Sequence, residues 1–142
     1  MNNSSILGIT FGVFGIFFLL IIALVVFSVV INWKMFEKAG KPGWASIVPI
    51  YNSIVLFEII GYKWYYIFFI FAGGIPVIGY VVAILFSISY SIKLSKSFGQ
   101  SVGFGIGLAF LNPIFVAIIA FDKNIKYIGP SVNGDIDFND LF

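Results

Sequence analysis

The chain has 142 residues, of which 61% are hydrophobic and 10% are charged, and its formal net charge is +2. A soluble domain carries about 25% charged residues, so the composition excludes an ordinary soluble globular protein. The small net charge gives no reason to expect a nucleic-acid partner. Cysteine and histidine are absent, which removes disulfides, cysteine-based metal sites and the commonest general base. We therefore expect no enzyme, no cofactor and no metal site.

Four long apolar runs make up most of the chain: residues 6–31, 44–60, 64–92 and 102–121. Glu58 is the one charged residue inside them. A bilayer core of about 30 Å needs roughly 20 apolar helical residues, and a lipid-exposed span must be a helix or part of a closed barrel. The runs are too long and too uniformly apolar for barrel strands. The predicted fold class is an all-α integral membrane protein with four transmembrane helices.

The first run, residues 6–31, follows a start that lacks the positively charged region of a signal peptide, and we expect a retained span. Lys34, Lys38 and Lys41 follow this run. With four crossings and the N-terminus outside, five of the eight lysines lie on the cytoplasmic side. The positive-inside rule therefore favours an N-terminus outside and, with four crossings, a C-terminus outside as well.

The second run, residues 44–60, is the shortest of the four, with Pro49 and Asn52 near its start and Glu58 near its end. An alternative is a re-entrant segment here, which leaves three crossings and brings the C-terminus inside. Intramembrane polar groups are costly and often functional. Asn52, Glu58 and Asn112 are therefore the candidate intramembrane polar site, although Glu58 lies close enough to Lys63 for a pairing that only anchors the interface.

The third and fourth runs carry small residues at regular spacing. Within residues 64–92, the segment Gly73-Gly74-Ile75-Pro76 also predicts a kink. Small residues at every fourth position let helix backbones approach closely, and we expect them to pack the third helix against the fourth. The candidate helix-packing residues, with one pair in the first run, are Gly8, Gly12, Gly79, Ala83, Ser87, Ser91, Gly99, Gly103 and Gly107.

The loop after the first run is the most patterned polar stretch, and Gly40, Pro42 and Gly43 predict a turn there. Residues 33–52 read WKMFEKAGKPGWASIVPIYN, and the later segments include WYY, IPV and SKSFGQSVGFGIGL. With these segments, the chain resembles a family of small uncharacterised bacterial multi-pass membrane proteins over roughly residues 33–121. The resemblance implies a multi-pass topology in the bacterial cytoplasmic (inner) membrane and no established activity.

Some proteins of that family carry a signal peptidase I label, which can be tested against the residues. Such peptidases use a serine nucleophile and a lysine base on a sizeable β-rich domain outside the membrane. The chain has no segment for such a domain, and its serine–lysine neighbours, Ser91 with Lys93 and Ser95 with Lys96, lie at the end of an apolar run. A nucleophile also needs an oxyanion site, so we reject peptidase activity.

We divide the chain into a single polytopic transmembrane helical domain, residues 1–128, and an acidic polar tail, residues 129–142. The tail has three aspartates and no lysine, and we expect it to contact a partner. Its predicted anchors are Phe138, Leu141 and Phe142, with the aspartates steering the tail towards a basic surface.

These features favour a non-enzymatic accessory or scaffold subunit of a larger membrane or envelope assembly. Its expected partners are the lipid bilayer and other membrane protein subunits or further copies of the chain. The alternative is a small oligomeric transporter or channel-like protein, built around Asn52, Glu58 and the proline breaks.

Overall fold

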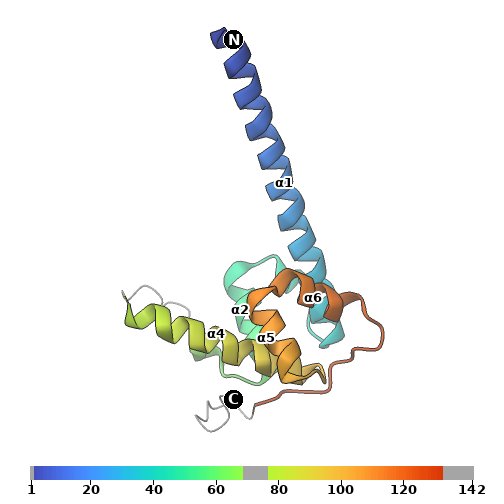
Figure 1. The fold of residues 1–142 in the computed structure, drawn as a ribbon. Coiled ribbons are helices and arrows are strands. Elements are labelled where there is room, and N and C mark those ends of the chain that lie inside the picture. Colours follow the sequence, from blue (N-terminus) through green and yellow to red (C-terminus); the bar gives the residue numbers. More distant parts are fainter. Residues whose placement is uncertain (1, 69–76, 133–142) are drawn as a thin grey trace. The chain divides into compact units, whose positions relative to one another are not determined.

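The computed structural model describes residues 2–68 and 77–132. All regular elements in these two ranges are helices (Figure 1), so the predicted all-α fold class is confirmed. Contacts divide the chain into two units, residues 1–30 and residues 31–142. The kink predicted at residues 73–76 and the tail anchors Phe138, Leu141 and Phe142 lie outside the described residues.

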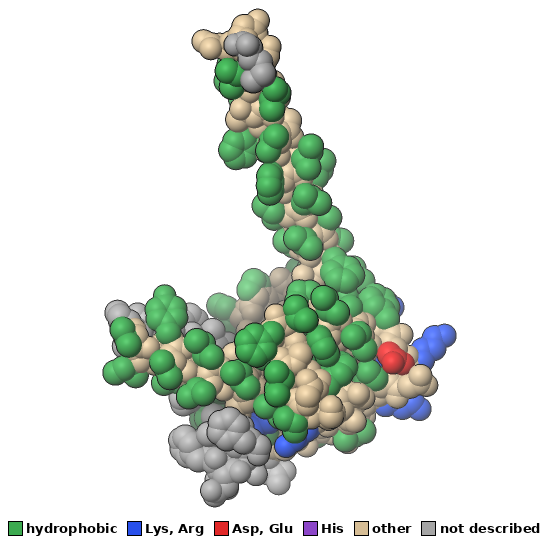
Figure 2. Space-filling view, in the orientation of Figure 1, with side chains coloured by type: hydrophobic (Ala, Val, Ile, Leu, Met, Phe, Trp, Pro, Cys, Tyr) green, Lys and Arg blue, Asp and Glu red, His purple; other side chains and the backbone are tan. Residues whose placement is uncertain are grey.

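Helix α1 runs from Asn3 to Lys38 and has 36 residues, which is about 54 Å at 1.5 Å per residue. The Asn2 side chain caps its start, because Oδ1 accepts a hydrogen bond of 3.0 Å from the Ser5 backbone N–H. Up to residue 30 the helix exposes large apolar side chains along its whole length, and Phe11 is 73% exposed. Figure 2 shows such side chains along the face of α1 that is in view. A helix that is hydrophobic all round is covered by lipid or by other helices.

The end of α1 confirms the turn predicted from the glycines. Gly40 has a φ of 71°, its N–H donates to the Glu37 carbonyl at 3.0 Å, and the Lys41 N–H donates to the Phe36 carbonyl at 2.8 Å. This pair of bonds is a Schellman motif, which needs a left-handed residue that glycine adopts without strain. Gly61 and Gly99 take the same left-handed role just after the helices that end at Ile60 and Ser97.

The second unit contains the remaining described elements. In chain order they are η1 Gly43–Ser46, α2 Pro49–Ile60, η2 Trp64–Ile67, α4 Ile78–Ser97, α5 Val102–Phe110 and α6 Asn112–Phe121. The core contains the end of α1 together with parts of α2, α4, α5 and α6. Phe36, Phe57 and Phe98 are the largest side chains that are fully buried in it.

Four crossings are not confirmed. Of the described helices, α1 and α4 are long and apolar enough to cross a membrane. Helix α2 has 12 residues, about 18 Å, which is shorter than a hydrocarbon core of about 30 Å. The fourth apolar run forms two helices of 9 and 10 residues, because Leu111 leaves the helical conformation and Pro113 begins a new helix.

Helices α4 and α5 are in close contact, and the glycine at the contact is Gly105, which is not among the candidate packing residues. A Cβ added to Gly105 would lie 2.5 Å from the Ile92 Cα, whereas one added to Gly103 would meet only the Ser101 side chain, at 3.8 Å. The Ser95 hydroxyl also donates to the Ser101 carbonyl at 2.8 Å.

The other candidate packing residues have varied surroundings. In α4, Gly79 and Ser91 are buried, and Ala83 and Ser87 line a cavity next to α2. A Cβ at Gly107 would overlap the Phe115 ring of α6. Among the described residues, nothing lies within 4 Å of a Cβ added to Gly8 or Gly12.

The contrast between Gly105 and Gly103 gives the first prediction. Gly105→Ala should destabilise the protein by about 1–3 kcal/mol, because the added methyl group overlaps the backbone of α4. Gly103→Ala in the same helix should be neutral or stabilising by up to about 1 kcal/mol, since alanine is the better helix former. Thermal unfolding in detergent measures both. Equal stability of the two variants would show that α5 does not approach α4 at Gly105.

Candidate functional site

The ends of four helices meet one segment of the chain, and we call this region the helix-end junction: Lys38, Ile59–Ile60, Ser97 and residues 119–132. Its first part is Lys38, the last residue of α1. The Lys38 ammonium donates to the backbone carbonyls of Ile119, Asp122 and Ile125, the last of these at 3.1 Å. A helix leaves its final carbonyls without partners inside the helix, so one lysine satisfies carbonyls at and beyond the end of α6.

The segment that follows α6 also supplies hydrogen-bond donors to the final carbonyls of α2 and α4. The Ile128 N–H donates to the Ser97 carbonyl at 2.9 Å, and the Val132 N–H donates to the Ile60 carbonyl at 3.0 Å. The Ser131 hydroxyl adds a bond of 2.8 Å to the Lys93 carbonyl. Residues 129–132, which begin the predicted acidic tail, therefore pack against α2 and α4.

Tyr127 lies in the middle of this segment and donates its hydroxyl to the Ile59 carbonyl at 2.6 Å. Burial raises the pKa of the Tyr127 phenol above its ordinary value. The phenol therefore stays protonated at neutral pH and remains a hydrogen-bond donor to the end of α2.

Glu58 pairs with Lys41 and not with Lys63, which corrects the pairing expected from the sequence. The Lys41 Nζ lies 2.8 Å from the Glu58 Oε2, and the two side chains are 33% and 47% exposed. The reason is the turn at Gly40, which places the end of α1 beside the last turn of α2. An exposed pair of this kind contributes about 0.2–1 kcal/mol to the free energy of unfolding. The pair matters mainly because it shows that the turn after α1 lies beside the last turn of α2.

The three residues of the predicted intramembrane polar site make separate contacts. The Asn52 side-chain amide donates to the Ser46 carbonyl at 3.1 Å, Glu58 bonds Lys41, and Asn112 is exposed at the start of α6. No group of three metal-ligating residues occurs in residues 2–68 and 77–132.

Sequence reasoning missed the residues that form the junction. Lys38 lies 81 positions before Ile119, and no local pattern joins a lysine to carbonyls so far along the chain. The available signal was the number of lysines just beyond the apolar runs, which reads equally well as membrane anchoring.

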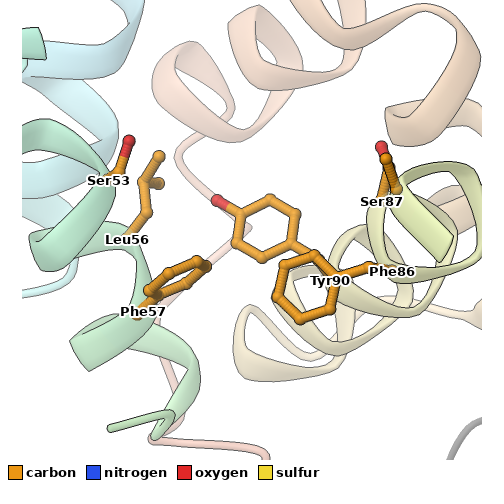
Figure 3. Close-up of a pocket in the computed structure, with 7 residues that line it drawn as sticks. Ser53, Leu56, Phe57, Phe86, Ser87 and Tyr90 are labelled. Carbon is orange, nitrogen blue, oxygen red and sulfur yellow. The ribbon is translucent and has the colours of Figure 1, made fainter. Parts of the chain in front are cut away.

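A cavity of about 300 Å³ lies between α2 and α4. Aromatic rings form much of its wall: the Phe57 ring centroid is 6.0 Å from that of Phe86 and 5.9 Å from that of Tyr90, edge to face in both cases. Figure 3 shows the Tyr90 hydroxyl directed towards α2, with Ser53 and Ser87 on opposite sides of the space. The lining residues are Ser53, Leu56, Phe57, Ala83, Phe86, Ser87 and Tyr90.

These features define a class: a helical protein whose described residues include two helices suited to crossing a membrane and a packed helical unit joined at its helix ends. A family model described as a family of unknown function (DUF5684) matches residues 44–130. This is more than half of the chain, so the protein belongs to that family, in agreement with the resemblance to an uncharacterised family. The match runs from η1 into the junction. No curated protein and no solved structure matches the chain.

The second prediction concerns Lys38. Lys38→Met keeps most of the apolar stem but removes the ammonium from the carbonyls at the end of α6. We expect a loss of about 1.5–3 kcal/mol, which is typical of hydrogen bonds to charged groups, and faster amide exchange in residues 119–125. Lys126→Met, at an exposed lysine of the same segment, is the control and should change little. Equal effects from the two variants would mean that Lys38 does not bond these carbonyls.

Proposed function

We propose that the protein is a non-enzymatic integral membrane protein that serves as an accessory or scaffold subunit of a larger membrane assembly. The observation that carries this proposal is the contrast between the two units. Residues 31–132 contain a core of their own, whereas α1 exposes apolar side chains such as Phe14 and Leu19 on every side up to residue 30. Lipid or the helices of other subunits would cover such a surface.

The use of the polar side chains also supports a structural role. Lys38, Lys41, Asn52 and Glu58 all make hydrogen bonds within the fold. The alternative of a small transporter or channel needs Asn52, Glu58 and Asn112 to act together. Because their contacts are separate, we retain the accessory function.

The junction supports a particular topology. The chain enters α5 beside the end of α4, where Ile128 bonds Ser97 and Ser95 bonds Ser101, and it leaves α6 where Lys38 bonds the Asp122 carbonyl. Both ends of the α5–α6 pair therefore lie at the junction, which supports a re-entrant hairpin. The pair Lys41–Glu58 likewise brings the end of α2 back to the end of α1. We infer that the ends of α1, α2, α4 and α6 share one side of the membrane.

This topology changes the distribution of charge. All eight lysines follow the end of an apolar helix or lie in its last turns: Lys34, Lys38, Lys41, Lys63, Lys93, Lys96, Lys123 and Lys126. If these ends share one side, so do all the lysines. Four alternating crossings instead give five on one side and three on the other. The positive-inside rule then favours a cytoplasmic junction in the bacterial inner membrane, with the N-terminus outside.

The third prediction tests the accessory function. The full chain, tagged and solubilised in mild detergent, should run as an assembly larger than one copy and should contain partner subunits or further copies. Truncation after Val132 keeps the junction, so it should leave thermal unfolding unchanged and weaken the assembly at least about tenfold, or about 1.4 kcal/mol. Native mass measurement and thermal unfolding are the readouts.

A matched control separates the anchors from the charge of the tail. Replacing Phe138, Leu141 and Phe142 with serine in the full chain keeps the three aspartates and should weaken the assembly as the truncation does. A monodisperse monomer from the full chain, with no partner, would contradict the proposed function.

A further inference from the structure

The cavity between α2 and α4 has a chemistry that limits what it can hold. Its wall is aromatic and aliphatic, from Phe57, Phe86 and Leu56 among others, and none of its lining residues is charged. An ionic ligand would lose its hydration in such a space without gaining a charged partner. The occupant must therefore be uncharged over the part that enters.

Two hydroxyls that line the cavity can each donate a hydrogen bond to an occupant. Within the described residues, the hydroxyls of Tyr90 and Ser87 make no hydrogen bond, and Figure 3 shows the Tyr90 hydroxyl directed into the space between the two helices. The third hydroxyl, of Ser53, makes a long contact of 3.4 Å with the Pro49 carbonyl. Unpaired donors in an apolar site favour an occupant with an acceptor such as a carbonyl oxygen.

The surface around the cavity indicates where that occupant comes from. On α4, Tyr80, Ile84 and Leu85 expose apolar side chains, and Ile50 does so on α2. Under the membrane location proposed above, these side chains face acyl chains, so the cavity opens among lipids. A volume of about 300 Å³ is at the lower limit of ligand pockets, which suits part of one lipid and not a whole one.

We propose that this cavity binds one acyl chain of a membrane phospholipid, whose ester carbonyl accepts a hydrogen bond from Tyr90 or Ser87. The inference rests on the proposed membrane function. It gives that function a chemical consequence: the chain carries a bound lipid between α2 and α4 into any assembly that it joins.

The test uses the full chain in bilayer vesicles that contain a phosphatidylcholine with a photoreactive diazirine in one acyl chain. After irradiation, the labelled peptides are mapped by mass spectrometry. We expect labelling concentrated on residues 53–57 and 83–90. Ala83→Phe fills the cavity and should reduce this labelling at least about tenfold, whereas Ile84→Phe, at an exposed neighbour on the same helix, should leave it unchanged.

A second pair of variants removes single hydroxyls and keeps the rings. Tyr90→Phe should lower the labelling about three- to fivefold through the loss of one hydrogen bond, and Tyr80→Phe, at an exposed tyrosine of α4, should not. Uniform labelling of every exposed apolar side chain, or equal labelling of Ala83→Phe and Ile84→Phe, would overturn the lipid site. So would a bound compound of non-lipid mass in the native mass spectrum.

Extraction with alkaline carbonate distinguishes failure of the proposed lipid site from failure of the proposed membrane function. Protein that stays in the membrane without labelling of the cavity would overturn the lipid site alone. Protein that carbonate releases would overturn the membrane function, and the lipid site with it.

Discussion

The backbone carbonyls at the ends of the apolar helices are the constraint on which this structure depends. A buried or lipid-exposed carbonyl without a donor is costly, and every helix presents several. Lys38 bonds three of these carbonyls, and the backbone amides of Ile128 and Val132 bond those of Ser97 and Ile60. Satisfying the helix ends in one place brings four helices together, and the aromatic core and the cavity between α2 and α4 follow from that convergence.

The junction also relates the fold to the membrane. A short helix such as α2 cannot cross a bilayer alone, whereas a broken pair such as α5 and α6 can enter and return if both of its ends find partners on one side. The lysines that follow each helix then lie on that side, where they favour the cytoplasm. In this account the packed unit organises the chain inside the membrane, and α1, exposed and apolar up to residue 30, offers its surface to lipid or partner helices.

Residue patterns predicted the fold class because long uncharged runs leave few alternatives to helices in lipid. They also predicted the turn at Gly40, since its glycine and proline neighbours specify a turn locally. They indicated packing of the third helix against the fourth but did not single out Gly105, because Gly99, from which the spacing was counted, ends α4 and the register restarts in α5. Four crossings stay unconfirmed, because run length alone does not reveal that the second run forms a helix of only 12 residues or that the fourth run breaks at Leu111. The bonds of Lys38 join residues too distant for any local pattern.

The most direct test of the junction is the accessibility of single cysteines, for which the chain has no natural background. Ser4→Cys, Lys63→Cys and Lys126→Cys are each treated with a membrane-impermeant thiol reagent, in intact cells and after permeabilisation. The account predicts that Ser4→Cys is labelled in intact cells, and that Lys63→Cys and Lys126→Cys are labelled only after permeabilisation. Labelling of Lys63→Cys and Lys126→Cys in intact cells together with Ser4→Cys would restore four alternating crossings and contradict a junction on one side.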